Sequence, residues 1–256
     1  MDKNHLLIDL DDISFSYPGG RPVLENLCLQ LNEKERVGLI GPNGSGKTTL
    51  FHIIMGLLKP SSGSIEIFGK KVRDKKDFRP VRQQIGLLFQ DADDQLFSPT
   101  VLEDVAFGPL NQGRSISEAR DIARETLSTL GLDGFENRIT YRLSGGEKKL
   151  VSLATVLAMK PKVLLLDEPT TGLDSETTKK IIDVVERIDI SYIFISHNMD
   201  FINRTTDKIC GISNARIFLE KEKVPHSHIH AHGYGQMPHI HSDSDEINPR
   251  TDLEKD

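Results

Sequence analysis

One run of the chain has residue types and spacing suited to binding phosphate: Gly41-Pro42-Asn43-Gly44-Ser45-Gly46-Lys47-Thr48. Its glycines let backbone N–H groups turn inward and approach phosphate oxygens closely, because no Cβ obstructs them. The Lys47 ammonium is a point charge for the outer phosphates, and the Thr48 hydroxyl can hold Mg²⁺. We expect the following Thr49 to contact the nucleotide as well. The run therefore predicts a site for a nucleoside triphosphate.

The elements beside this loop suit the same chemistry. The apolar run Val37 to Ile40 is typical of a buried strand, and Thr49 to Leu58 has apolar residues at helical spacing. A helix that begins there directs the partial positive charge of its N-terminus at the phosphates. The alternative, a glycine-rich turn that binds nothing, would not need a strand before it and a helix after it.

A second candidate site follows another apolar run, Val163 to Leu166. The next two residues are Asp167 and Glu168, about 120 residues after the phosphate loop. Open α/β sheets bind ligands at the carboxyl ends of their strands, where these carboxylates would lie. We expect Asp167 to hold Mg²⁺ and Glu168 to accept a proton from an attacking water.

Composition limits the classes of protein to consider. The chain has 256 residues, 37% hydrophobic and 27% charged, and a net charge of −6, which gives no indication of nucleic-acid binding. Cys28 and Cys210 are far apart and are expected to lie in the core. No apolar stretch reaches the roughly 20 residues that span a bilayer, and the first residues lack a signal-peptide pattern. We expect a cytoplasmic protein whose membrane association depends on a partner.

Strand and helix patterns alternate along most of the chain, which predicts a parallel α/β sheet. Strands are predicted at 6–17, 23–31, 64–68, 85–89, 163–166 and 192–195, and helices at 101–110, 117–130, 148–159 and 175–188. Residues from about 91 to 158 form a helical insertion. From about residue 220 the chain is polar and rich in histidine, and a core pattern is absent.

Leu143-Ser144-Gly145-Gly146-Glu147 resembles the signature sequence of ATP-binding cassette (ABC) transporter nucleotide-binding subunits. The resemblance implies a P-loop NTPase (RecA-like) α/β domain over residues 1–219, with a helical subdomain at about 91–158 and an antiparallel β region. It also implies that two subunits, identical or different, close head-to-tail around ATP. Ser144, Gly145 and Gly146, at a helix N-terminus, would then bind the γ-phosphate held by the opposite subunit. The alternative for this pentapeptide alone is a capped helix.

The resemblance assigns roles to further residues. Gln90 is similar to the glutamine that senses the metal and faces the membrane partner, so Mg²⁺ would be held by Thr48, Gln90 and Asp167. His197 is similar to the histidine that contacts the γ-phosphate, and Asp174 lies in a loop that communicates across the dimer. Tyr17 is similar to the aromatic residue that stacks on adenine, although it could instead be an exposed turn residue. Catalysis would rest on Glu168, His197, Lys47 and Gln90.

Two features narrow the transporter class. The segment from Leu88 to Phe97 resembles its counterpart in energy-coupling-factor importers, which include cobalt and nickel systems. Ala92 stands where those relatives usually have proline, and Leu150 stands where the ABC family as a whole usually has arginine after the signature. Leu150 belongs to an apolar helical stripe and is expected to pack in the core.

The second feature is a cluster of six of the nine histidines near the C-terminus: His226, His228, His230, His232, His239 and His241. Imidazole suits nickel, copper, zinc and cobalt, although a solvated segment that binds no ion is a competing interpretation. We expect an ATPase at the cytoplasmic face of the cell membrane that powers nickel or cobalt import through integral membrane subunits, without nucleic acid. The alternatives are an importer of a vitamin, amino acid or peptide, a soluble ABC ATPase acting on ribosomes or DNA, and a metal-sensing module.

Overall fold

A six-stranded sheet forms the centre of the fold in the computed structural model, which describes residues 6–219. Its strands lie in the order β10-β9-β3-β8-β7-β6. Their bounds are β3 Arg36–Ile40, β6 Ile85–Leu88, β7 Val163–Asp167, β8 Ser191–Ile195, β9 Lys208–Ser213 and β10 Arg216–Leu219. Neighbouring strands are parallel except for β9 and β10. All five residues of β7 and of β8 are buried, which explains their continuous apolar sequences.

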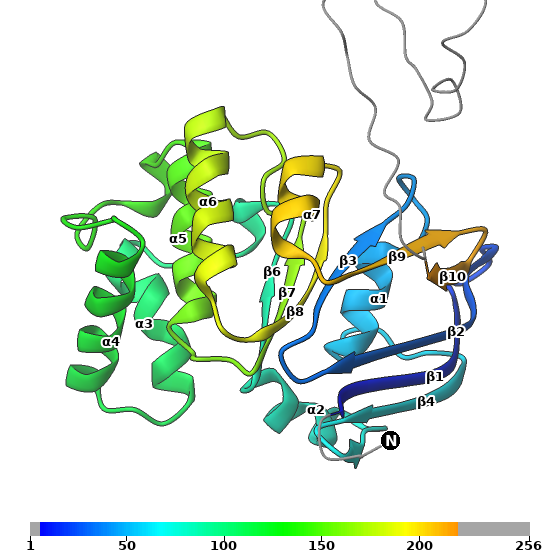
Figure 1. Cartoon of the computed structure of the whole chain (residues 1–256). Helices are drawn as coiled ribbons and strands as arrows, with labels where there is room; N and C mark the ends of the chain where they lie inside the picture. The colour runs from blue at the N-terminus through cyan, green and yellow to red at the C-terminus, as the bar shows by residue number, and fades with distance from the viewer. Residues whose placement is uncertain (1–5, 220–256) are drawn as a thin grey trace, which may run out of the picture. The chain divides into compact units, whose positions relative to one another are not determined.

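A second sheet is antiparallel, with strand order β2-β1-β4-β5. It is the expected antiparallel β region, and its strands are β1 Leu6–Ser16, β2 Pro22–Asn32, β4 Ser62–Ile67 and β5 Lys70–Lys71. Along β2 buried and more exposed side chains alternate, as in a strand with only one face against the core. Helix α1, Lys47–Ile54, lies between this sheet and the six-stranded sheet (Figure 1).

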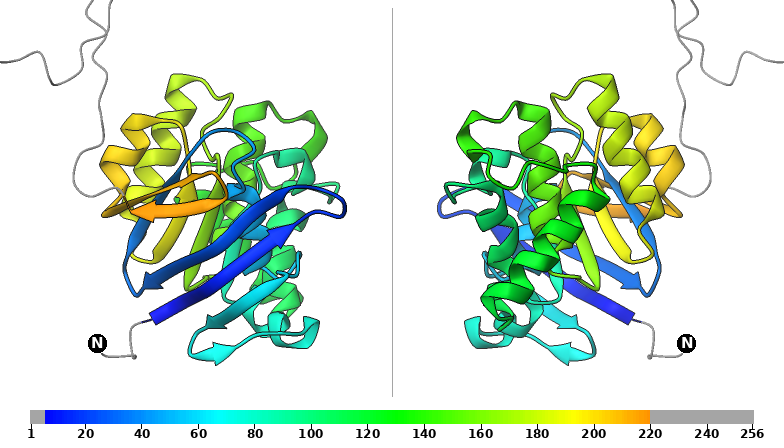
Figure 2. Two further views of the ribbon diagram at one scale, coloured as in Figure 1. Left: turned by 90° about the vertical axis from the view of Figure 1, so that its right-hand side faces the viewer. Right: turned by 90° about the vertical axis from the view of Figure 1, so that its left-hand side faces the viewer.

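Most of the other helices lie on the opposite side of the six-stranded sheet (Figure 2). They are α3 Val101–Asn111, α4 Ile116–Thr129, α5 Gly145–Leu157, α6 Ser175–Arg187 and α7 Met199–Thr205. Short 3₁₀ turns lie at Ala92–Asp94 and Thr140–Arg142. Successive residues of β7 point into different cores: Val163 and Leu165 face α1, whereas Leu164 and Leu166 face these helices.

Several element boundaries differ from those predicted. Helix α1 ends at Ile54 rather than Leu58, because Gly56 has φ +63° and the Arg82 guanidinium donates to the carbonyls of Met55 and Gly56. Leu57, which lies within the predicted helix, is therefore outside α1 and 53% exposed. Helix α4 begins at Ile116 with Ser115 as its N-cap, so the predicted start at Ser117 is one residue late.

Two helices have no counterpart in the prediction. Helix α2, Lys75–Arg82, is polar and contains Pro80, and α7 is only seven residues long, so neither shows a strong apolar period. Leu150 packs in the helical core as expected. Within residues 6–219, the helices are all too short or too polar to cross a membrane.

Candidate functional site

The phosphate loop connects β3 to α1, so the loop joins a buried strand to a helix N-terminus. Gly41 has φ +151°, and a Cβ at this position would lie 2.3 Å from the Ile212 carbonyl oxygen. Gly46 has φ +101°, and a Cβ there would crowd Leu24 and Val23. These two glycines are required by local packing as well as by backbone conformation.

Lys47 is buried at the start of α1. Its Nζ donates to the carbonyl oxygens of Gly41 at 2.8 Å and Pro42 at 3.0 Å. Burial lowers the pKa of Lys47, while the charges of Glu168 and Asp167 act in the opposite direction. The loop also contains Ser45, whose Oγ is buried and has no hydrogen-bond partner among the described residues. Donors gathered around a loop in this way can bind an anion.

Asp167 ends β7 and lies across from the start of α1. Burial raises the pKa of its carboxyl, although a hydrogen bond from Thr48 works in the opposite direction. Its Oδ1 is buried and lacks a hydrogen-bond partner in the described part of the chain. The Thr48 hydroxyl and the side chain of Gln90 lie nearby. Together with the unpartnered carboxylate oxygen of Asp167 they are the oxygen ligands that Mg²⁺ prefers, so these residues fit the ion.

Glu168 is held in a strained backbone conformation, with φ +45°. Its N–H donates to the Ile195 carbonyl oxygen at 3.0 Å. One carboxylate oxygen, Oε2, accepts from the Thr171 hydroxyl at 2.8 Å, and the other, Oε1, lies 3.3 Å from His197 Nε2. The Thr171 hydroxyl therefore orients one carboxylate oxygen while the other lies beside the imidazole, an arrangement suited to accepting a proton from a water.

These groups line one cavity of about 420 Å³. It brings together most of the predicted nucleotide and catalytic residues: Tyr17, Asn43, Gly44, Gly46, Lys47, Thr48, Thr49, Gln90, Asp167, Glu168 and His197. The Tyr17 hydroxyl lies 3.2 Å from Thr49 Oγ1, and its ring packs edge-on against Phe15. Tyr17 thus lies at the rim of the cavity, and it is also an exposed residue at the start of a turn, since the Gly20 N–H donates to its carbonyl.

Ser144 and Asp174, also predicted to act at the site, do not line this cavity. Ser144 caps α5: its Oγ accepts from Glu147 N, and its own N–H donates to Glu147 Oε2 at 2.8 Å. Asp174 caps α6 by accepting from Thr177. A Cβ on Gly145 would meet open space, so the N-terminus of α5 is accessible from outside the chain. Ser144 and Gly145 are therefore exposed on the surface of this chain.

The structure adds two residues that sequence reasoning missed. Thr171 orients Glu168, and the buried Lys149 donates to the backbone carbonyls of Phe89 and Gln90. Thr171 lies only three residues after Glu168, in the turn that follows it, and this closeness in sequence could have identified it. Lys149 gave no signal, because a lysine in a helix is usually solvated.

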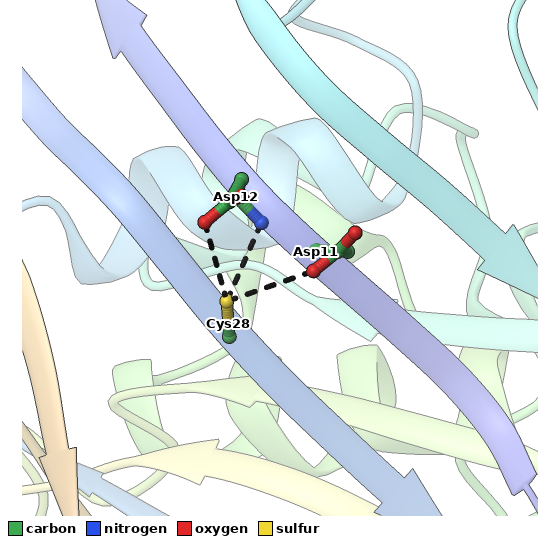
Figure 3. Close-up of side chains that lie close together, drawn as sticks. All are labelled: Asp11, Asp12 and Cys28. Carbon is green, nitrogen blue, oxygen red and sulfur yellow. Dashed lines mark hydrogen bonds between the residues drawn. The ribbon is translucent and has the colours of Figure 1, made fainter.

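A third cluster lies away from the cavity. Cys28 on β2 is exposed and approaches the carboxylates of Asp11 and Asp12 on β1 (Figure 3). The expectation that both cysteines lie in the core is therefore wrong for Cys28 and confirmed for Cys210. The face of β2 that carries Cys28 points outward, which the spacing of two distant cysteines could not indicate. The six histidines from His226 to His241 lie outside the described residues.

Comparison with known proteins identifies the arrangement. The family model for the ABC transporter matches residues 24–171. A putative ABC transporter ATP-binding protein of Nitratidesulfovibrio vulgaris is 51% identical over 236 residues, which cover 92% of this chain and 86% of the relative. The energy-coupling factor transporter ATP-binding protein EcfA of Methanothermobacter thermautotrophicus is 44% identical, covering 84% of this chain and 70% of the relative.

Solved structures agree. CbiO1 from Clostridium perfringens, part of the ABC transporter complex cbiONQ, matches with TM-score 0.75 and 34% identity, covering 84% of this chain and 88% of that one. A dimeric post-hydrolysis state of the ATP-binding cassette MJ0796, bound to ADP and Pi, matches with TM-score 0.77 and 28% identity. That match covers 85% of this chain and 98% of the other.

Proposed function

Because this chain belongs to the ABC transporter family, as an ATP-hydrolysing subunit of the energy-coupling-factor type, we propose that it powers import of nickel or cobalt. The observation that carries the choice of substrate is the cluster of six histidines from His226 to His241, in a chain with only nine. Imidazole prefers late divalent transition metals, so such a cluster suits a protein that handles them. Import of a vitamin, amino acid or peptide is the competing function.

The cavity accommodates the phosphates of ATP in our proposal. Backbone N–H groups from Gly44 to Thr48 and the N-terminus of α1 surround the position of the phosphates. Lys47 exchanges its hydrogen bonds to two loop carbonyls for phosphate oxygens, and Tyr17 at the rim stacks on the adenine. Thr48, Asp167 and Gln90 would hold Mg²⁺, which would supply positive charge to neutralise the phosphates.

Hydrolysis begins when Glu168 positions a water for attack on the γ-phosphate and accepts its proton. The hydroxyl of Thr171 fixes one carboxylate oxygen of Glu168, leaving the other beside His197. His197 and Lys47 then face the charge that develops on the transferred phosphoryl group. Orientation of the base by two neighbours limits its rotation, and thereby keeps it in a productive position.

A second subunit completes each site. Ser144 and Gly145 do not line the 420 Å³ cavity of their own chain; they lie at an exposed helix N-terminus, and helix N-termini bind anions. Head-to-tail closure of two copies places each of these termini against the γ-phosphate held by the other. The match to a dimeric cassette supports this arrangement. A homodimer suffices, since one chain carries all the motifs, and a heterodimer with a similar subunit is equally compatible.

The partners of this dimer are integral membrane subunits, and closure of the dimer would drive their movement. An exposed apolar group formed by Phe97, Phe107 and Leu110 follows the Gln90 segment, with the rings of Phe97 and Phe107 packed edge-on. Exposed aromatic side chains of this kind favour a protein interface. Docking of a membrane subunit here would hold the chain at the cytoplasmic face of the cell membrane.

The test is transport by the complex reconstituted in liposomes with its membrane subunits. Uptake of radioactive Ni²⁺ or Co²⁺ would support the proposal if it requires ATP on the side of the membrane where this subunit lies. The uptake should also stop when the subunit carries Glu168→Gln. ATP-dependent uptake of a vitamin without any metal uptake would reject the metal and keep the ATPase role.

A further inference from the structure

Lys149 lies on the same helix as the signature residues but points away from them, into the interior. It belongs to α5, five residues after Ser144, and is 3% exposed. Its Nζ donates to the carbonyl oxygens of Phe89 at 2.9 Å and Gln90 at 2.8 Å. One ammonium thus holds two successive carbonyls of the segment that carries Gln90, which fixes the backbone at that residue.

The charge of Lys149 is balanced locally. Burial lowers its pKa to about 8, while Asp167, Asp91 and Glu168 raise it. Lys149, Gln90, Asp167 and Thr48 line a common cavity of about 720 Å³ next to the nucleotide cavity. A buried lysine costs free energy through desolvation, so its retention here needs a compensating interaction. The two carbonyl oxygens and the nearby carboxylates supply it.

Other contacts attach the same segment to α5. Gln95 Oε1 accepts from Phe89 N at 3.1 Å, and its Nε2 donates to Ser152 O at 2.9 Å and Thr155 Oγ1 at 2.8 Å. Lys148 forms an ion pair with Asp93. These contacts hold residues on either side of Gln90, but only Lys149 bonds the carbonyl of Gln90 itself among the interactions of the described chain.

From this geometry we propose that Lys149 is a positioning residue: it fixes Gln90 at the Mg²⁺ site and makes that site move together with the signature helix α5. The inference rests on the proposed role of Gln90 as a metal ligand. Since Ser144 caps the N-terminus of α5, a shift of the helix as the opposite subunit docks would be transmitted through Lys149 to Gln90. The same helix then serves two sites, the partner's γ-phosphate and this chain's own metal.

The experiment compares Lys149→Met, which removes the charge and the donors at similar length, with Lys149→Arg, which retains both. Each is made in a Glu168→Gln background, loaded with ATP and Mn²⁺ in place of Mg²⁺, and examined by electron paramagnetic resonance. The spectrum reports the ligands of the ion independently of turnover. Gln90→Ala and the double variant Gln90→Ala/Lys149→Met complete a cycle. Lys148→Met is the matched control, because it removes a neighbouring lysine that does not contact Gln90.

We expect Lys149→Met and Gln90→Ala to change the Mn²⁺ spectrum alike, the double variant to match Gln90→Ala, and Lys149→Arg and Lys148→Met to match the parent. With Glu168 intact, Lys149→Met should raise the Mg²⁺ concentration for half-maximal hydrolysis on the order of 10-fold. A changed spectrum in Gln90→Ala with a parental one in Lys149→Met overturns the inference alone. An unchanged spectrum in Gln90→Ala overturns the proposed role of Gln90. If Lys149→Met does not fold, Lys149→Gln takes its place. A changed Mn²⁺ spectrum in that variant supports the inference, and a parental spectrum overturns it.

Discussion

His197 Nε2 lies 3.3 Å from Glu168 Oε1, although 29 residues separate the two in the chain. The cause is the parallel pairing of β7 with β8, in which Asp167 is opposite Ile195. Both side chains follow the carboxyl ends of adjacent strands, and the Glu168 N–H donates across to the Ile195 carbonyl. The sheet therefore places a carboxylate and an imidazole at one edge, beside the phosphate loop.

Glu168→Gln should retain ATP binding and lose most hydrolysis, on the order of 10²–10⁴-fold, because the amide cannot accept the proton of the attacking water. An ATP-bound dimer should accumulate, because the closed dimer reopens only after its ATP is hydrolysed. Steady-state phosphate release and size-exclusion chromatography with ATP measure the two effects. Near-normal turnover would show that another group is the base.

Lys47→Ala is the contrasting variant. It removes the buried ammonium from the phosphate loop, so nucleotide binding as well as turnover should weaken. Binding of a fluorescent ATP analogue separates it from Glu168→Gln. Equal nucleotide affinity in Lys47→Ala and the parent protein would contradict the assignment of this loop.

Thr171→Val should lower the rate of hydrolysis on the order of 10-fold while leaving ATP affinity unchanged. The hydroxyl donates to Glu168 Oε2 at 2.8 Å, and a hydrogen bond to a charged group contributes about 1.5 kcal/mol or more. Thr129→Val is the control, because that hydroxyl donates to a carbonyl of its own helix, Glu125 O. Identical rates in the two variants would remove Thr171 from the catalytic arrangement.

Ser144→Arg places a bulky side chain where the opposing γ-phosphate must dock. ATP binding by single subunits should survive, whereas dimerisation and hydrolysis should fail. Ser115→Arg is a matched control, because Ser115 caps α4 through the same hydrogen bonds with Glu118 that Ser144 makes with Glu147. Losing either cap costs about 1 kcal/mol, so both variants should lose similar thermal stability.

Analytical ultracentrifugation with ATP reports dimerisation for both variants. Only Ser144→Arg should stay monomeric. Full-rate hydrolysis by a Ser144→Arg monomer would refute the composite site.

Truncation after Leu219 should keep basal ATP hydrolysis and remove Ni²⁺ binding. The cluster from His226 to His241 contains none of the residues at the nucleotide cavity. Neutral imidazoles should bind Ni²⁺ more tightly than Co²⁺ and release metal as the pH falls through about 6.5, where free histidine gains a proton. Titration calorimetry of both forms is the measurement. Equal weak binding would remove the main argument for nickel.

Local motifs made much of the site predictable. Three of its motifs are short runs of characteristic residues next to a strand or helix. They are the phosphate loop, the pair Asp167 and Glu168 at the end of a strand, and the signature at the start of α5. The strands with continuous apolar sequences were found because burial on both faces removes the need for polar positions. Helix α2 was missed, since its polar sequence and Pro80 give no apolar period, and α1 was predicted too long.

By itself, the sequence determined the family, the sheet type and the residues available for phosphate, Mg²⁺ and proton transfer, because those depend on residue type and local spacing. Tertiary structure alone decided which of these residues meet. It brought Lys149 within hydrogen-bond distance of the Gln90 carbonyl, 59 residues away in the chain. It also turned Cys28 to the surface and left Ser144 outside the cavity that holds the phosphate loop. Such contacts follow from packing between distant elements, and local sequence patterns carry no information about the partner that each side chain meets.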